Sequence, residues 1–328
     1  MPDRSSPAPP NAAGPDAARP DAARPDAARP DPAPPDPAPP ATGGAVRGRP
    51  QPGHHVRDRA VAEGDGPGAW VACASGILWR EALRFVQQKE RFLSALVRPL
   101  MWLFIFAAGL RSVIELTVQE PYGSAIAYEV YILPGLCAMI QLFQGMQSSL
   151  SMVYDRETGA MRALLIAPFP RWFLLAAKLA AAAAVSVLQV YAFLAIAALY
   201  GIRLPAVGYL TVLPALIVSG LMLGAIGLFL SSAIRKLENF AGVMNFVIFP
   251  MFFASSALYP LWRMAEGSPL LADIAAANPF TYAVELIRFA LYAELEPMSL
   301  AVVVGVGAGF FAAASLAYDP GAGLMRRR

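Results

Sequence analysis

Past residue 70 the chain alternates long apolar runs with short polar segments. An α-helix needs about 20 predominantly apolar residues to cross the ~30 Å hydrocarbon layer of a bilayer. Six runs approach or exceed this length, and they cover residues 96–112, 131–150, 172–200, 209–230, 240–259 and 300–317. The first is the least uniform, because Arg98 and Arg111 bracket its apolar part. The pattern predicts an all-α polytopic membrane protein, with six transmembrane helices in a domain over residues 93–320 and a basic cytoplasmic tail at 321–328.

Just before the first run, residues 77–91 place apolar and polar side chains on opposite faces at helical spacing. The apolar face holds Leu78, Trp79, Ala82, Leu83, Phe85 and Val86, and the polar face holds Arg80, Arg84, Gln87, Gln88 and Arg91. A basic face opposite a Trp, Leu and Phe face is typical of a helix that lies in the membrane interface. We therefore predict an N-terminal amphipathic interfacial helix over residues 70–92.

The first 67 residues are rich in Pro, Ala, Asp and Arg. Residues 15–39 repeat with a period of five, as PDAAR three times and PDPAP twice. Proline blocks helix interiors and sheet ladders, and such a segment has little apolar surface to bury. We expect a disordered cytoplasmic arm over residues 1–67 that acts as a tether, with a docking arm as the alternative. It is not a signal peptide, because no apolar core follows its charged start.

The composition supports the membrane class. Of the 328 residues, 57% are hydrophobic and 15% are charged, whereas soluble domains average about 25% charged residues. The chain lacks the polar side chains that would cover a soluble globule, so a lipid bilayer is an expected partner and nucleic acid is not. His54 and His55 lie in the arm, away from any Cys or carboxylate cluster, and no metal site is predicted.

The distribution of Lys and Arg predicts the orientation, because cytoplasmic loops carry the excess of positive charge. Twelve lie on one side of the predicted spans, namely Lys89, Arg91, Arg98, Arg156, Arg162, Arg171, Lys178, Arg235, Lys236, Arg326, Arg327 and Arg328. Four lie on the other, namely Arg111, Arg203, Arg263 and Arg288. Both termini are therefore predicted to be cytoplasmic.

The stretch YDRETGAMRALLIAPFPRWFLLAAK, residues 154–178, covers the loop between the second and third runs and the start of the third, and it holds six charged residues. Asp155 is a good N-cap for a helix, and Glu157 would lie in its first turn, where the dipole favours acidic side chains. An apolar stripe follows at i, i+3, i+4 and i+7, formed by Met161, Leu164, Leu165 and Pro168. The pattern is compatible with a short amphipathic cytoplasmic helix and equally with an ordinary solvated loop.

Two kinds of transport chemistry are disfavoured. The second, fourth, fifth and sixth runs hold no Asp, Glu, Lys, Arg or His in their interiors, and ion-coupled transporters usually keep such a residue at membrane depth. A sodium site made of backbone groups stays as an alternative. The phosphate-binding loop of an ATPase needs a Gly-Lys pair, but the three lysines of the chain follow Gln, Ala and Arg. Energy for uphill transport would come from another chain.

Two separated motifs resemble a known family. The first is Arg156-Glu157-Thr158-Gly159 with Leu164, Leu165, Pro168, Arg171 and Lys178; the second combines NFVIFPMFFASSALYPLW at 245–262 with NPFTYAVELIRFAL at 278–291. Both resemble ABC-2 type transporter permeases, in matching order on a six-span frame from about residue 79 to 318. Arg162 departs from the acidic residue that relatives often carry. The segment around 243–262 is also similar to a subgroup encoded beside quinoprotein alcohol-oxidation genes.

The resemblance implies an export machine in the bacterial cytoplasmic (inner) membrane. Two permease subunits would form the pathway, and a separate ATP-binding subunit would hold ATP and Mg²⁺. The loop after the second span would be the coupling helix that docks on this ATPase. Its residues would be Asp155, Arg156, Glu157, Gly159, Met161, Leu164 and Leu165.

The resemblance also implies features on the outer side. Short helices over residues 269–276 and 279–293 would dip into the membrane, with Glu285 and Arg288 near the outer mouth. Phe249, Phe252 and Phe253 are candidates for an apolar outer gate, although such a cluster is more often plain helix packing.

Two other classes stay open. An integral membrane enzyme would need grouped carboxylates or histidines, and the sequence offers no such spacing, so no catalytic residue is assigned. A membrane scaffold without transport activity is the other alternative.

Overall fold

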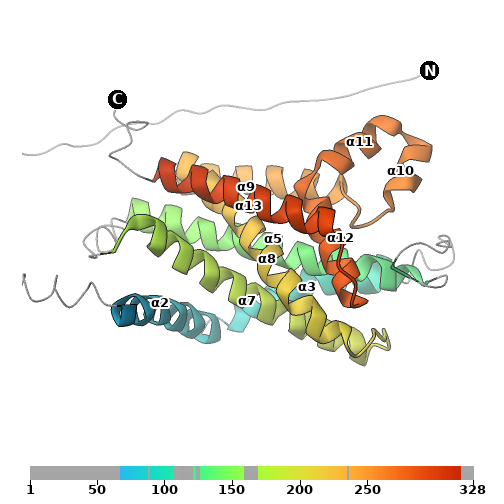
Figure 1. The fold of residues 1–328 in the computed structure, drawn as a ribbon, viewed down its shortest axis with the longest axis horizontal. Helices are drawn as coiled ribbons and strands as arrows, with labels where there is room; N and C mark the ends of the chain where they lie inside the picture. Colours follow the sequence, from blue (N-terminus) through green and yellow to red (C-terminus); the bar gives the residue numbers. More distant parts are fainter. Residues whose placement is uncertain are drawn as a thin grey trace, which may run out of the picture. The chain divides into compact units, whose positions relative to one another are not determined.

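The computed structural model describes residues 67–87, 89–106, 109, 121–122, 126–158, 169–234 and 236–318, all within one compact unit, Pro52–Arg328. Its regular elements are helices (Figure 1). They are α2 Pro67–Gln87, α3 Lys89–Met101, the π-helix η1 Trp102–Phe106, α5 Tyr128–Glu157, α7 Arg171–Leu199, α8 Gly208–Ala233, α9 Leu237–Phe253, α10 Leu261–Gly267, α11 Pro269–Ala277, α12 Pro279–Leu291 and α13 Pro297–Ala317. Three predicted segments lie wholly or mostly outside the described residues. They are the arm (residues 1–66), the loop after the second predicted run (159–168) and the basic tail (319–328).

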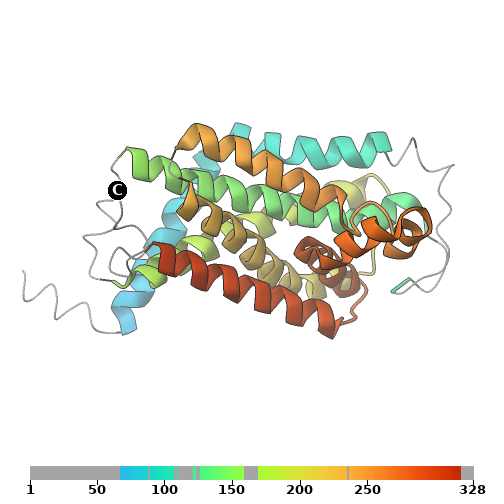
Figure 2. The same cartoon turned by 90° about the horizontal axis from the view of Figure 1, so that it is seen from above.

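The helix α8 lies at the centre of the packing. It contacts α5, α7, α12 and α13, and α5 in turn packs against α3, α7, α9 and α12. The long helices run side by side (Figures 1 and 2), and successive ones along the chain run in opposite directions, as short connections require. A bundle of this kind brings the ends of helices that are distant in sequence together at two levels.

Three described helices are long and apolar enough to cross a membrane, namely α7, α8 and α13. They correspond to the third, fourth and sixth predicted runs. The pair α11 and α12, bent by 77°, would make a fourth crossing if it counts as one span. Shorter apolar helices occupy Ala95–Ile105 and Leu237–Phe253, which overlap the first and fifth runs. The described chain is thus all-helical with three or four candidate crossings, and six spans stay a prediction.

The close approach of α5 and α8 depends on small residues. A Cβ atom placed on Gly145 of α5 would lie 2.9 Å from the Cα of Gly224 on α8. One turn before Gly145 on α5, the buried Gln141 amide donates a hydrogen bond to the Leu216 carbonyl at 2.6 Å. It also accepts one from the Ser219 hydroxyl at 2.6 Å. Small-residue contacts and interhelical hydrogen bonds are the usual means of association for apolar helices in lipid.

The helix α9 ends earlier than the apolar pattern predicts. The fifth run continues to residue 259, but α9 stops at Phe253, and a turn leads to α10. Asn278 stabilises this end, because its side-chain amide donates to the carbonyls of Met251 and Ala254 at 2.7 and 2.6 Å. Carbonyl groups at a helix C-terminus have no partner within the helix, so a side chain from a later segment completes the end of α9.

The structure contains the two short helices that the resemblance implied before the last run, as α11 and α12, and their dip into the membrane stays a prediction. Each begins at a proline that follows a capping residue. The Ser268 hydroxyl accepts from the Leu271 amide at 3.4 Å, and the Asn278 side-chain oxygen accepts from the Phe280 amide at 3.0 Å. Capping residues followed by proline favour a helix start.

The N-terminal helix α2 runs obliquely to the long helices (Figure 2) and packs against α7. Trp70 fixes this contact, because its ring lies 4.7 Å from the Phe173 ring and 5.5 Å from the Phe169 ring. The predicted interfacial helix over 70–92 corresponds to α2 and the beginning of α3. Its position in the membrane interface stays a prediction.

Candidate functional site

The candidate site lies where α5, α8 and α13 end and α7 and α9 begin, at the left of Figure 1. We call this level of the bundle the Glu157 end. Three consecutive residues of α5, Asp155, Arg156 and Glu157, each contact a different element there. A small apolar cluster lies at the same end, formed by Met152, Leu175, Leu228, Ala314 and Tyr318.

Asp155 joins α5 to α7. Its carboxylate lies 3.0 Å from the Lys178 ammonium, and the side chains are 22% and 6% exposed. Lys178 is thus nearly enclosed, and a buried ammonium is costly unless an anion neutralises it. The ion pair holds the start of α7 against the end of α5.

Arg156 joins α5 to α8 and to the end of α13. Its guanidinium donates to the carbonyl of Ile234, the C-cap of α8, at 3.4 Å and lies 4.9 Å from the centre of the Tyr318 ring. The Tyr318 carbonyl accepts a hydrogen bond from Arg171 at 3.3 Å, and the hydroxyl bonds to Ser231 at 2.9 Å. Burial raises the pKa of Tyr318, with the Ser231 hydrogen bond and the Arg156 charge opposing this effect.

Glu157 joins α5 to α9. Its carboxylate accepts a hydrogen bond from the backbone amide of Leu237, the first residue of α9, at 2.8 Å. The N-cap residue of α9, Lys236, makes no such side-chain bond itself. Glu157 therefore supplies the capping interaction from another helix, and its negative charge lies at the positive end of the α9 dipole.

One local prediction is wrong. The sequence pattern placed Asp155 and Glu157 at the beginning of a new helix, but both lie in the last turn of α5, which continues to Glu157. No proline or glycine interrupts the chain between Gly145 and Thr158, so the helix runs on until the Thr158 hydroxyl bonds back to the Tyr154 carbonyl at 2.9 Å. The other predicted coupling residues, Gly159, Met161, Leu164 and Leu165, lie outside the described residues.

A second polar cluster lies at the opposite level, which we call the Arg288 end. Arg288 is only 2% exposed and pairs with Glu285 on the same helix, α12. It also donates to the Ser256 carbonyl at 2.9 Å, and its guanidinium lies 4.2 Å from the centre of the Tyr131 ring. The two residues predicted at the outer mouth thus form an enclosed ion pair that holds the α9–α10 connection against α5 and α12.

The candidate gate residues separate into two environments. Phe252 is 1% exposed, and its ring lies 5.6 Å from that of Trp102 and 6.2 Å from that of Phe280. Phe249 and Phe253 are 45% and 47% exposed and stack on each other at 6.2 Å. Phe252 has the environment of a core side chain, and the gate stays a prediction for the exposed pair.

Sequence reasoning missed several members of these clusters. Tyr318 gave no signal, because it follows the last apolar run as a single aromatic residue. The carbonyls of Ile234 and Ser256 belong to the backbone, and no residue type marks them. Lys178 and Arg171 were noted for their charge, but their partners at the ends of α5 and α13 were not evident.

Apolar helices of membrane-crossing length, close glycine contacts between them and charged clusters at two levels define a polytopic membrane protein. Residues 75–292 match the family model described as ABC-2 type transporter, and the chain belongs to this family. It is accordingly a membrane transport permease.

The curated relatives agree with this assignment. The chain is 30% identical over 219 residues to a protein of Cyanophora paradoxa named transport permease ycf38, across 62% of this chain and 70% of that protein. The Porphyra purpurea protein of the same name is 27% identical across 65% and 72% of the two chains. A protein of Escherichia coli (strain K12) named multidrug ABC transporter permease YbhR is 28% identical over 178 residues, across 53% of this chain and 47% of that protein.

Proposed function

We propose that this chain is the membrane-spanning subunit of an ATP-driven exporter in the bacterial inner membrane. It works as a dimer of permease subunits with a separate ATP-binding subunit, and the Glu157 end faces the cytoplasm. The family supports this proposal, because ABC-2 permeases generally pair with an ATP-binding subunit.

The arrangement of the Glu157 end carries the proposal. Asp155, Arg156 and Glu157 contact Lys178 of α7, the C-cap of α8 and the first residue of α9. Arg156 also contacts the last turn of α13 through Tyr318. A push on the end of α5 and the residues after it therefore reaches four further helices through direct contacts. A permease that is driven by an ATPase docked at one place needs such contacts, because they transmit the movement of one helix end to the other helices.

The test uses the complex of the permease with an ATP-binding subunit encoded nearby. Glu157→Gln keeps the side-chain oxygen that caps α9 but removes the charge, whereas Glu157→Lys removes both. If Glu157 contacts the ATPase, both variants should reduce co-purification of the ATPase and substrate-stimulated ATP hydrolysis. We expect about a tenfold loss for Glu157→Lys, which corresponds to ~1.4 kcal/mol of docking free energy.

The matched control is Glu266→Lys, the same charge reversal on α10, where the carboxylate is 61% exposed and pairs with Arg263. This variant should assemble and hydrolyse ATP as the wild type does. Equal assembly and hydrolysis by the wild type and both Glu157 variants would contradict docking at this end and would favour a scaffold role.

A further inference from the structure

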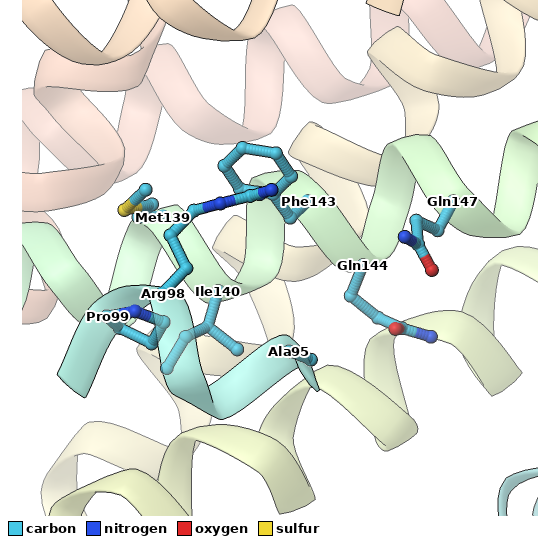
Figure 3. A pocket seen from close by; sticks show the side chains of 8 residues that line it. All are labelled: Ala95, Arg98, Pro99, Met139, Ile140, Phe143, Gln144 and Gln147. Carbon is cyan, nitrogen blue, oxygen red and sulfur yellow. The ribbon is translucent and has the colours of Figure 1, made fainter. Parts of the chain in front are cut away.

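A cavity of about 120 Å³ lies between α3 and α5 (Figure 3). On α3 it is lined by the turn that carries Arg98, and on α5 by successive turns of one face from Met139 to Gln147. This part of α5 is the middle of the 30-residue helix. The sequence pattern had placed Arg98 at the edge of the first run, where it could reach the interface.

Arg98 is the charged group of the cavity. Its guanidinium lies 3.7 Å from the centre of the Phe143 ring, stacked on the aromatic face as Figure 3 shows. The Arg98 side chain is exposed, and it has no ion-pair or hydrogen-bond partner among the described residues. Stacking holds an arginine while its N–H groups stay free to bind a ligand. Arg98 lies beside the middle of the second predicted run, where an arginine would be costly in hydrocarbon, and such residues mark functional sites.

The remaining polar lining is suited to an anion. Gln144 and Gln147 are the other polar residues that line the cavity, and among the described side chains no carboxylate lines it. The Gln144 side-chain oxygen accepts a hydrogen bond from Gln189 at 3.4 Å, so its NH₂ group is the part left for a ligand. A guanidinium without a carboxylate beside it favours an acceptor-rich, negatively charged group and disfavours a cation.

The size and surroundings of the cavity restrict the ligand further. A cavity of ~150 Å³ holds one benzene molecule, so 120 Å³ admits a phosphate or carboxylate but not a long hydrocarbon chain. Met139 and Ile140 supply an apolar wall. Val97 and Met101, which flank Arg98 on α3, are 50% and 52% exposed. An apolar chain attached to the bound group can therefore lie outside along α3.

We propose that this cavity binds the anionic headgroup of an amphipathic molecule, with a phosphate or carboxylate against Arg98, and that such a molecule is the exported cargo. The binding step needs only this chain, whereas the assignment as cargo rests on the proposed export function. The experiments below keep the two apart.

Binding is measured with the full chain in nanodiscs of phosphatidylcholine, using dodecyl phosphate as the probe. We expect saturable binding to the wild type, and about a tenfold or greater loss in Arg98→Gln, because the charged hydrogen bonds are removed. Arg98→Lys keeps the charge but not the fork of donors, and its affinity should fall between the two. The control Arg263→Gln removes an exposed charge at the other end of the bundle and should bind as the wild type does.

Two further probes test the chemical class. Dodecyltrimethylammonium has the same chain with a positive headgroup, and inorganic phosphate has the headgroup without the chain. Both should bind at least tenfold more weakly than dodecyl phosphate. Equal binding of either probe, or an Arg98→Gln affinity equal to that of the wild type, would overturn the proposal.

A photoactivatable dodecyl phosphate gives a measurement that does not depend on a variant. Peptide mapping of the wild type should find the label within residues 95–101 or 139–147, and labelling elsewhere would contradict the site. Proteoliposomes of the complete transporter then test the cargo. ATP-dependent transfer of the labelled amphiphile should be lost in Arg98→Gln and kept in Arg263→Gln.

The source of the ligand is distinguished by the lipid. If phosphatidylglycerol in the nanodisc displaces the probe and no transfer is seen, the cavity holds a resident lipid and the assignment as cargo is wrong. If the probe binds through Arg98 but no ATP-binding subunit assembles with the chain, the proposed function fails while the binding site stands.

Discussion

The Glu157 carboxylate accepts a hydrogen bond from the Leu237 amide at 2.8 Å, so the last turn of α5 caps the first turn of α9. The two residues are 80 positions apart in sequence. Helix N-termini leave four backbone amides without intrahelical partners, and here one of them is satisfied by a different helix. This hydrogen bond fixes the start of α9 relative to the end of α5.

This link predicts the order of stability of three Glu157 variants. Loss of a cap costs about 0.5–2 kcal/mol, so Glu157→Lys should lower the midpoint of thermal unfolding in detergent. Glu157→Gln should lower the midpoint less, because an acceptor remains. Glu157→Asp should lie between these two variants, because its carboxylate oxygen lies farther from α9. A Glu157→Lys protein as stable as the wild type would show that this bond contributes nothing.

The pair of Asp155 and Lys178 predicts a non-additive double variant. Asp155→Asn leaves the nearly enclosed Lys178 ammonium without its anion and should destabilise the protein by about 1–3 kcal/mol. Lys178→Met in the same chain removes the stranded charge and should recover most of the loss. Thermal unfolding of the two single variants and the double variant measures the coupling, and strictly additive effects would contradict an interaction between these residues.

Arg288 and Arg263 form a matched pair of arginines with acidic partners three residues away. Arg288 is 3% exposed at its side chain and Arg263 is 52% exposed. Arg288→Met leaves the Glu285 carboxylate without its ion-pair partner, although the Ser256 carbonyl keeps its bond from Tyr131, and should destabilise by about 2–4 kcal/mol. Arg263→Met should change stability by less than ~1 kcal/mol. Equal shifts in unfolding midpoint would mean that burial does not determine the contribution of these pairs.

The contact of α5 with α8 predicts opposite outcomes for two glycine substitutions. In Gly145→Ala the added Cβ meets the backbone of Gly224 at 2.9 Å, and overpacking of this kind costs about 1–3 kcal/mol. In Gly242→Ala, on α9, the added Cβ meets nothing within 4 Å, and alanine is the better helix former by up to ~1 kcal/mol. Thermal unfolding should therefore show a loss at position 145 and no loss at position 242.

The proposed orientation is tested by cysteine labelling in intact cells. A cysteine at Ala265, exposed on α10, should react with an impermeant thiol reagent, whereas one at Lys236, exposed before α9, should stay protected until the cells are opened. The background carries Cys73→Ser, and Cys137 can stay because it is buried. The reverse labelling pattern would place the Glu157 end outside and would exclude docking of a cytoplasmic ATPase there.

The positions of the long helices follow from the lengths of the apolar runs. A continuous apolar run in lipid forms a helix, because a helix satisfies its backbone hydrogen bonds within the segment. The predicted runs 172–200 and 209–230 became Arg171–Leu199 and Gly208–Ala233. The end of α9 could not be predicted in this way, since the apolar run continues past Phe253 and the helix stops where Asn278 meets its carbonyls. A tertiary contact determined that boundary, and local composition did not.

The same distinction explains the candidate site. Its charged residues were evident from the sequence, because charge is rare in this chain, and their type suggested contacts at a helix end. Local capping preference then assigned Asp155 and Glu157 to the start of a helix. Their partners, Lys178 and the Leu237 amide, are 23 and 80 positions away, and no local pattern shows such distances.

The connection from α9 to α10 has a consequence for how its backbone is hydrated. The chain leaves helical geometry there, and side chains donate to several carbonyls at or beside the break. Asn278 donates to those of Met251 and Ala254, Arg288 and Tyr131 donate to that of Ser256, and Tyr128 donates to that of Leu258. Backbone groups without such donors would recruit water. Because side chains of α5 and α12 and the cap residue Asn278 supply these donors, the break in the helix needs fewer water molecules to satisfy its backbone, and its shape is set by the bundle rather than by hydration.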